Sequence, residues 1–277
     1  HHLTLSRVAQ KEDLSDPEVV QAFAQLVRTP QRLTALYLLT VADIRGTSPK
    51  VWNAWKGKLI EDCYRQTLRV LGGGQPNQLA EIESRKAEAR ALLALSSQLP
   101  GTEQRLWDTL ELSYFTRHEA TDIAWHARML WRHVDGAQPV VSVRASAVGE
   151  GLQVLVYAPD QADLFARICG YFDRAGFDIQ DAKVHTSSAG YALDTFQVVH
   201  PGMDTGVPTA YRDMISLVET QLSTALRSSA PLHEPGRGRV SRRVRSFPVV
   251  PRFSRRPAEQ AQRWLLSIST GDRAGLL

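Results

Sequence analysis

The sequence has little cysteine, no long apolar run and no amino-terminal targeting signal. Two cysteines, Cys63 and Cys169, occur in 277 residues, too few for a disulfide framework or a cysteine-based zinc site. Apolar runs such as 154–158 are far shorter than the ~20 residues of a membrane helix. The first residues are polar and lack the apolar stretch of a signal peptide. We therefore expect a protein of a reducing, cytoplasmic environment with no membrane partner.

The ends of the chain and its composition indicate its size class. It begins with His1 and His2 rather than methionine, and it ends at Leu277, at what reads as the start of a structured element. We expect a piece of a longer protein. Hydrophobic residues make up 43% and charged residues 22%, a mixture typical of globular proteins, and the length suits two domains.

Positive charge is concentrated near the end of the chain. Residues 237–263 contain nine arginines and one acid, Glu259, so this segment carries +8 and the remainder carries −4. Such a segment can bind phosphate backbones. However, prolines punctuate it and only Phe247 and Phe253 could stack on bases. The composition favours an Arg/Pro-rich linker over 231–263, with nucleic-acid binding as the less favoured interpretation.

Residues 1–135 are predicted to be all helical. Asp16 followed by Pro17 is a good helix start, and Thr29 with Pro30 repeats the signal. A third helix is predicted from Ser48, and others over 78–97, 102–114 and 119–133, separated by glycine- or proline-containing breaks. Within 30–47, apolar residues recur at the spacing of one helix face. The members of this stripe are Leu33, Leu36, Tyr37, Thr40, Val41 and Ile44.

Residues 139–230 change to a strand pattern. Leu152, Val154 and Val156 alternate with Gln153, Leu155 and Tyr157, which predicts a strand. A helix over 163–175, two strands over 177–186 and 191–200, and a helix over 209–228 follow. The order βαββα predicts a small sandwich with helices on one face of an antiparallel sheet. The fold class is therefore α+β.

The last residues form a weak internal repeat of this sandwich. A strand from Trp264 is followed by Gly271 and Asp272, as the strand at 152–158 is followed by Pro159 and Asp160. Residues 264–277 are thus predicted to begin a second, truncated copy. Without a complete sheet of its own, this stub is expected to be poorly ordered or paired with the edge of the first sandwich.

Asp43 is a candidate metal ligand. It lies four residues after Leu39 and seven after Leu36, on or beside the apolar stripe, where an unpaired carboxylate is costly. Arg45, a helix end or a metal ion could compensate it, and histidine with aspartate suits a metal that activates water. The alternative is an ordinary capping aspartate. His118, His126 and His133 are interpreted as structural or surface residues.

The turn at 160–163 is a candidate anion site, because it lies at the start of a helix. Free backbone N–H groups and the positive end of the helix dipole suit a carboxylate such as that of an amino acid. Ordinary helix capping by Asp160 is the alternative.

Several segments together resemble one family. In the helical part they are 2–6, 13–19, 38–47, 52–56 and 124–128, and in the remainder they are 158–160, 164–166, 194–196 and 272–277. The family is the bifunctional uridylyltransferase/uridylyl-removing enzyme that modifies the bacterial nitrogen regulator PII. The similarity runs in order through essentially the whole chain.

The resemblance implies a domain plan. In this family a nucleotidyltransferase domain uses UTP to attach UMP to PII, an HD-type metal phosphohydrolase domain removes it, and two ACT domains sense glutamine. Residues 1–135 resemble the C-terminal part of the HD-type domain with a helical connector, 139–230 the first ACT domain, and 264–277 the truncated start of the second. The nucleotidyltransferase and the histidine-aspartate pair that names the HD domain are absent, so we expect this fragment alone to be inactive.

The resemblance also implies site residues. Asp43 resembles the last metal-binding aspartate of HD domains and His2 a nearby histidine, which implies Mg²⁺ or Mn²⁺. The implied glutamine turns are Asp160, Gln161, Ala162 and Asp163 in the first copy, and Asp272, Arg273, Ala274 and Gly275 in the second. Ala162 and Asp163 stand where the family often has a glycine, whereas Gly275 is kept, so the second turn is the favoured glutamine site.

Two principal hypotheses follow. In the first, the chain is part of an enzyme that uridylylates and deuridylylates PII, contributing to metal-dependent hydrolysis of uridylyl-PII and to glutamine regulation. In the second, it is a catalytically inactive module that senses glutamine or docks PII. An arginine-rich nucleic-acid binder is the third and least favoured hypothesis.

Overall fold

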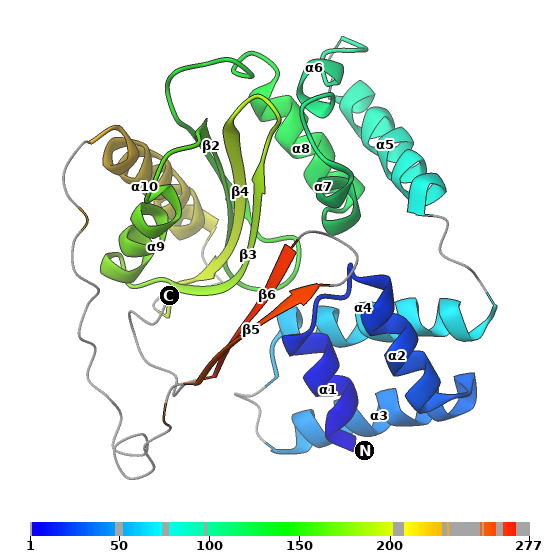
Figure 1. Cartoon of the computed structure of the whole chain (residues 1–277). Helices are drawn as coiled ribbons and strands as arrows, with labels where there is room; N and C mark the ends of the chain where they lie inside the picture. The colour runs from blue at the N-terminus through cyan, green and yellow to red at the C-terminus, as the bar shows by residue number, and fades with distance from the viewer. Residues whose placement is uncertain are drawn as a thin grey trace.

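In the computed structural model, a bundle of helices lies beside a larger body in which helices cover both faces of a sheet (Figure 1). We call α1–α4 the bundle, and α5–α10 with β1–β4 the sheet body. Helices combined with an antiparallel sheet are compatible with the predicted α+β class. The structure describes residues 2–47, 52–73, 78–96, 99–201, 208–228, 232, 250, 252–258 and 263–269.

The bundle has its own apolar core. It consists of α1 (His2–Lys11), α2 (Pro17–Val27), α3 (Pro30–Thr47) and α4 (Ala54–Leu71). Asp16 caps α2 as predicted, since its carboxylate accepts a hydrogen bond from the Glu18 N–H at 2.9 Å. The predicted stripe of α3 packs into the core, where Leu33 is fully buried. Its other buried members are Leu5, Val8, Ala9, Phe23, Val27, Ile60 and Cys63.

Helix α4 begins later than the helix predicted from Ser48. Asn53 has an extended backbone, and its side-chain oxygen accepts a hydrogen bond from the Lys56 N–H at 2.8 Å. Asn53 is therefore the N-cap and Ala54 the first helical residue. Residues 48–51 lie outside the described residues.

A second helical layer packs against the sheet. It consists of α5 (Gln78–Leu95), α6 (Gln104–Trp107), α7 (Leu112–Arg117) and α8 (Ala120–Leu130). The single helix predicted over 102–114 is wrong, because the structure divides it into α6 and α7. The Thr109 carbonyl accepts a hydrogen bond from the Ser188 N–H at 2.8 Å, beyond the end of β3. Glu111 then starts α7 from an extended backbone.

The four-stranded sheet is antiparallel, in the order β1-β2-β4-β3. Its strands are β1 (Val140–Ala145), β2 (Leu152–Pro159), β3 (Asp178–Thr186) and β4 (Tyr191–Val199). Helix α9 (Leu164–Arg174) connects β2 to β3, and α10 (Pro208–Arg227) follows β4. The predicted order βαββα is incomplete, because β1 precedes it. This strand pairs with β2 from Val140 opposite Tyr157 to Ala145 opposite Leu152. The observed order is ββαββα, and β1 provides one edge of the sheet.

Helices cover both faces of this sheet, whereas the sequence predicts helices on one face. Side chains alternate along β2, so Val154 and Val156 pack with α9 and α10. Leu155 and Tyr157 pack with the α5–α8 layer on the other face. The prediction failed because the second apolar row of β2 is also buried, against a helical layer that precedes the sheet in the chain.

Two further strands form a separate antiparallel pair. They are β5 (Arg252–Ala258) and β6 (Arg263–Ser269), with Arg252 opposite Ser269. Part of the predicted 231–263 linker is therefore a strand. The predicted strand from Trp264 pairs with this segment and not with the edge of the sandwich. The strands β5 and β6 are separated by four residues, and closing so short a loop costs less entropy than reaching the distant sheet edge.

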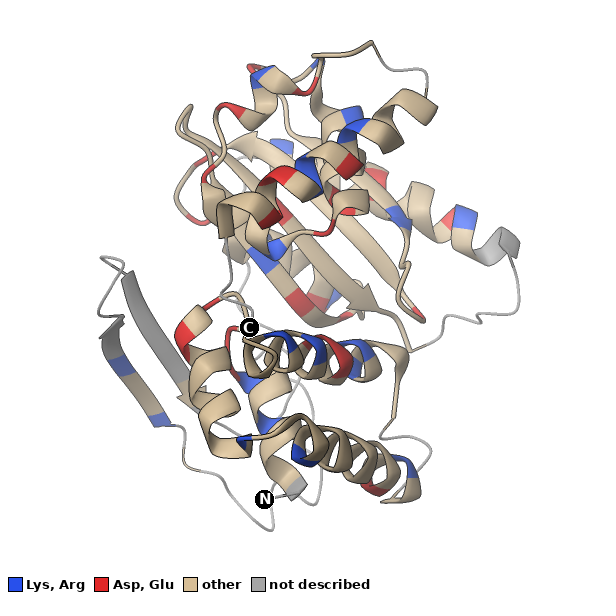
Figure 2. Ribbon diagram, turned by 90° about the vertical axis from the view of Figure 1, so that its right-hand side faces the viewer, with Lys and Arg blue, Asp and Glu red and all other residues tan. Residues whose placement is uncertain are grey.

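The surfaces of the helices are mixed in charge. Figure 2 shows Lys and Arg interspersed with Asp and Glu along them. None of the described helices is long and apolar enough to cross a membrane.

Candidate functional site

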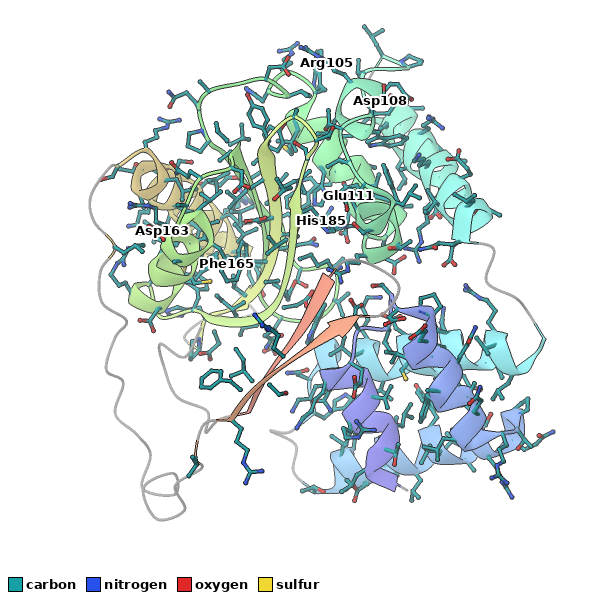
Figure 3. All side chains as sticks on the ribbon, in the orientation of Figure 1. Arg105, Asp108, Glu111, Asp163, Phe165 and His185 are labelled. Atoms are coloured by element: carbon teal, nitrogen blue, oxygen red, sulfur yellow. The ribbon has the colours of Figure 1, made fainter. Side chains whose placement is uncertain are left out.

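The turn between β2 and α9 is the first predicted site. Asp160, Gln161, Ala162 and Asp163 are all exposed, and Figure 3 shows Asp163 and Phe165 at the start of α9. The Asp160 N–H donates to the Gly190 carbonyl at 2.9 Å, and the Thr186 hydroxyl lies 3.4 Å from the Asp160 carboxylate. No side chain caps the start of α9. The alternative interpretation, helix capping by Asp160, is therefore wrong.

Asp163 has an unusual backbone. Its φ is +69°, in the left-handed region, which favours glycine and is tolerated by aspartate. This is one of the two positions where the resemblance implies a glycine. The geometry gives the physical reason for that preference, and the turn keeps its shape here without a glycine.

The second predicted turn cannot be compared with the first. Asp272, Arg273, Ala274 and Gly275 lie outside the described residues.

The predicted metal ligands lie in the bundle. Asp43 is exposed on α3, beside Leu39, which is 55% exposed. The expectation that its carboxylate needs compensation within an apolar stripe is wrong, because the buried side of α3 is the one that carries Leu33 and Thr40. His2 is the first residue of α1, and its side chain is not among those described.

The described residues do not bring metal ligands together. Within the described residues, no group of three or more His, Cys, Asp or Glu side chains could hold a metal ion. Asp43 by itself is one exposed carboxylate, whereas a metal site needs several converging ligands. The described part of this chain therefore does not form a metal centre.

A cluster of buried histidines lies between α7, α8 and the sheet. His118 and His126 are fully buried and His185 of β3 is nearly so; Figure 3 shows His185 on the strand facing these helices. The ring centres of His118 and His126 are 5.1 Å apart, and those of His118 and His185 are 5.2 Å apart. The Thr195 hydroxyl of β4 lies 3.4 Å from Nε2 of both His118 and His126. The predicted structural role of His118 and His126 is confirmed by this packing.

The cluster is built for neutral imidazoles. Burial, followed by the nearby charges of His126, Lys183 and His185, holds the pKa of His118 well below its usual value. Burial and Arg144 do the same to the pKa of His126. His118 Nδ1 lies 3.0 Å from the Tyr114 carbonyl, which can only accept, so in the neutral ring this nitrogen donates and Nε2 accepts. The cluster ties helices to sheet by neutral hydrogen bonds and ring contacts.

Asp194 is a buried acid on the opposite face of the sheet. It is 1% exposed in the centre of β4, and its Oδ1 has no hydrogen-bond partner among the described residues. Burial raises the pKa of its carboxyl to about 7, despite a backbone hydrogen bond from His185. It lies near Cys169 of α9, whose thiol pKa is raised to about 11 by burial and then by Asp194. The sequence contained this residue in a family motif but gave no signal of its burial.

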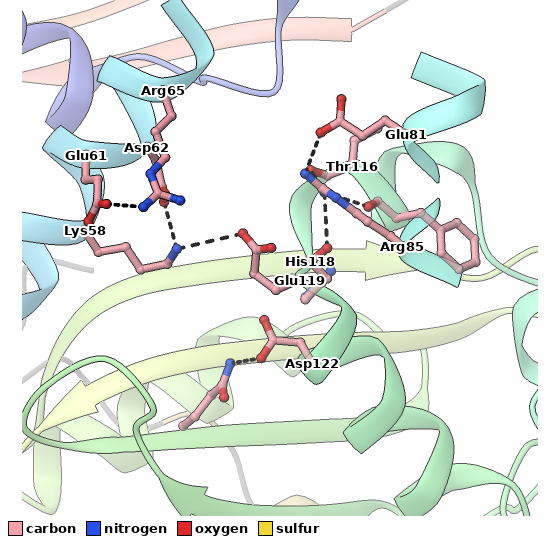
Figure 4. A network of polar contacts seen from close by, with 12 residues as sticks. Lys58, Glu61, Asp62, Arg65, Glu81, Arg85, Thr116, His118, Glu119 and Asp122 are labelled. Carbon is pink, nitrogen blue, oxygen red and sulfur yellow. Dashed lines mark hydrogen bonds and ion pairs between the residues drawn. The ribbon is translucent and has the colours of Figure 1, made fainter. Parts of the chain in front are cut away.

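A cleft of about 1470 Å³ lies between the bundle and the sheet body. Charged residues line both of its walls (Figure 4). Ion pairs bridge it between Lys58 and Glu119 at 3.8 Å, and between Arg69 and Glu81 at 3.2 Å. The walls of this cleft come from segments as far apart as α1 and β4, which is why sequence reasoning did not identify it.

Comparisons with known proteins find similar sequences along the whole chain. A family model described as "Uridylyltransferase GlnD fifth domain" matches residues 77–129, which is the span of α5–α8. The bifunctional uridylyltransferase/uridylyl-removing enzyme of Ralstonia nicotianae is 57% identical over all 277 residues. Those of Burkholderia thailandensis and Burkholderia mallei are 56% identical over the same length. No solved structure matches the chain.

These matches cover this chain and its relatives to different extents. All of this chain is covered, but only 32% of each of the three relatives. The chain therefore spans about a third of the length of the curated relatives it matches. Along its whole length, the chain is therefore similar to about a third of bifunctional uridylyltransferase/uridylyl-removing enzymes.

Proposed function

We propose that this chain is the part of a PII uridylyltransferase/uridylyl-removing enzyme that helps to remove UMP from PII and adjusts that activity to glutamine. The observation that carries the proposal is the 57% identity to such an enzyme over the whole chain, through the bundle and the sheet body alike. Attachment of UMP from UTP belongs, in this proposal, to the part of the relatives that the chain does not span. The proposed location is the cytoplasm.

The bundle is proposed to contribute to the hydrolytic site. Asp43 is exposed on α3 and is available to a ligand set completed by residues outside this chain. The described residues form no metal centre by themselves, so further ligands would have to come from elsewhere. The proposal is limited to Asp43, with His2 as a second candidate ligand, for Mg²⁺ or Mn²⁺ in the longer protein.

The β2–α9 turn is proposed as a place where an amino-acid ligand such as glutamine binds. Asp160, Gln161, Ala162 and Asp163 are exposed, and no side chain caps the start of α9. The positive end of the α9 dipole favours the carboxylate of the amino acid. The second turn, Asp272–Gly275 in the printed sequence, remains the other proposed glutamine site.

A chimaera tests the enzymatic proposal. The corresponding third of the Ralstonia nicotianae enzyme is replaced by this chain, and removal of UMP from uridylyl-PII is measured with and without glutamine. We expect glutamine-responsive hydrolysis, lost in an Asp43→Ala chimaera that still folds. Hydrolysis at the parental rate in the Asp43→Ala chimaera contradicts the role of Asp43.

The second candidate function is a module that senses glutamine or docks PII without catalysis. The absence of a metal-binding cluster among the described residues favours it. Calorimetric titration of this chain with glutamine, and separately with PII, tests it. Heat of binding together with an inactive chimaera supports this second function, and no heat from either ligand with the folded chain contradicts it.

A further inference from the structure

The junction between α7 and α8 contacts both sides of the cleft. Arg117 pairs with the Asp13 carboxylate, and its Nε lies 3.3 Å from the Ser15 hydroxyl, both in the loop between α1 and α2. Glu119 lies 3.8 Å from Lys58 Nζ on α4. His118, between them, is buried against the sheet. Residues 117–119, which we call the junction, thus hold the bundle with the two outer side chains and the sheet with the middle one.

A single arginine fixes the backbone of the junction. Arg85 of α5 donates from Nη1 to the carbonyls of Phe115 at 2.9 Å, Thr116 at 2.7 Å and His118 at 3.2 Å. Its Nη2 pairs with Glu81 at 3.0 Å, and Glu81 in turn pairs with Arg69 of the bundle. The rigid fork of the guanidinium holds the carbonyls with one nitrogen and the Glu81 carboxylate with the other, which a single ammonium group does less well. Arg85 therefore ties the orientation of the junction to the α5 wall of the cleft (Figure 4).

The contacts across the cleft are of a reversible kind. The side chains of Arg117 and Asp13 are 34% and 42% exposed, and those of Lys58 and Glu119 are 29% and 58% exposed. Exposed ion pairs are individually weak and are screened by salt. Among the described residues, the three apolar clusters each lie on one side of the cleft, and none of them joins the bundle to the sheet body.

On the sheet side the contacts are of the opposite kind. His118 is enclosed by Tyr114, His126, His185 and the Thr195 hydroxyl, with ring centres 4.6 to 5.2 Å from its own for Tyr114, His126 and His185. Because these contacts are buried and closely packed, His118 moves together with β3 and β4. A displacement of the sheet is thus passed to the junction, and from there to charged pairs that break readily.

We propose that the junction is a conformational coupler, through which a shift of the sheet opens or closes the cleft beside the bundle. This deepens the proposed function, since it names the path by which a glutamine-responsive sheet reaches the hydrolytic side of the molecule. It does not require that the ligand be glutamine.

Distance measurements on the full 277-residue chain test the coupler without any substrate. Spin labels are attached at Gln31→Cys on α3 and Ala166→Cys on α9, both exposed positions, while the native Cys63 and Cys169 are buried. Double electron–electron resonance then gives the distribution of bundle-to-sheet distances. The unlabelled parent chain treated with the spin label controls for reaction of the native cysteines.

The first arm breaks the outer contact. Arg117→Glu and Asp13→Arg are each expected to shift the main distance to longer values and to broaden it. The double variant restores opposite charges and is expected to return the distribution of the parent. The proposal fails if both single variants keep the parental distribution, or if the double variant keeps the longer distances. In either case the contact between Arg117 and Asp13 does not hold the bundle by opposite charge.

The second arm loosens the junction while keeping every charge. Arg85→Lys retains the positive charge but replaces two donor nitrogens, Nη1 on the three carbonyls and Nη2 on Glu81, by a single ammonium, so we expect a broader distribution. Arg90→Lys is the matched control, because Arg90 lies on the same helix and pairs with Glu103 at 3.0 Å, away from the junction. Equal distributions in the two variants, with both shown folded by circular dichroism, overturn the coupling.

Discussion

The bundle and the α5–α8 layer are both helical, yet they are attached to the sheet by different physics. The α5–α8 layer shares one apolar core with the sheet, to which Leu155, Tyr157 and Leu193 contribute. The apolar core of the bundle contains residues of α1–α4 and their loops only, and exposed ion pairs join the bundle to the sheet body. Apolar burial joins two elements into one cooperative unit, whereas exposed charges leave two units that can separate. The α5–α8 layer is therefore part of the sheet body, and the bundle is its neighbour.

The largest expected effect comes from breaking the shared core. Leu193→Ala removes a fully buried side chain between sheet and helices, and such truncations cost about 2–5 kcal/mol. Urea unfolding should show the loss, and hydrogen exchange should show it in α8 as well as in β4 but not in the bundle. Leu38→Ala on α3, where Leu38 is 61% exposed, is the control and should change stability by about 0.5 kcal/mol or less. Equal loss of protection in the bundle contradicts the comparison.

The second effect is a pH dependence confined to the sheet body. The pKa of Asp194 rises from 3.8 in the unfolded chain to about 7 in the folded one, so folding takes up a proton between these values. The stabilisation is complete below about pH 4, falls as pH rises through 7, and amounts to about 4 kcal/mol at most. Asp194→Asn should remove this dependence and be more stable than the parent at pH 8. Parallel unfolding curves of the two proteins from pH 5 to pH 8 would contradict the assignment.

The third effect is local to the β2–α9 turn. Asp163→Ala places a residue less tolerant of positive φ at φ +69° and should cost about 1 kcal/mol. Asp163→Gly removes the backbone strain, so its thermal unfolding should match or exceed that of the parent. A common loss in both variants would mean that the aspartate side chain, and not the backbone, matters for stability.

The smallest effect is expected at the cleft. Glu119→Gln removes the exposed pair with Lys58 but leaves the pair of Lys58 with Asp62 at 2.9 Å, and it should lower the free energy of unfolding by about 0.5 kcal/mol or less. Its unfolding is best measured at low and high salt, where the difference from the parent should disappear at high salt. A cost comparable to that of Leu193→Ala would show that the cleft is a permanent interface.

Local signals in the sequence were sufficient for much of the fold. Asp16 before Pro17 and the apolar stripe from Leu33 depend on residues a few positions apart, and the structure confirms both. Segments whose form depends on distant partners were not predictable in this way. The helix over 102–114 is divided where Ser188 donates to the Thr109 carbonyl, and that contact spans about a third of the chain.

The candidate site was less predictable for the same reason. Periodicity placed Asp43 near the apolar side of α3, but the side that is buried depends on how α1 and α4 pack against it. The left-handed backbone at Asp163 agrees with an expected glycine, whereas the cleft and the histidine cluster unite residues from segments far apart. Their assembly could not be derived from spacing.

The place of β1 in the sheet has a consequence for how such proteins can be rearranged. Since the edge strand comes from upstream of the sandwich, the hydrogen-bonded ladder is complete when the chain leaves α10 at Arg227. Of the described residues after α10, those of β5 and β6 pair with each other and add no strand to this sheet. Recombination after this helix would exchange the downstream segment without separating hydrogen-bonded strands of the sheet. A gene that ended there would still encode β1–β4 and the helices that cover them.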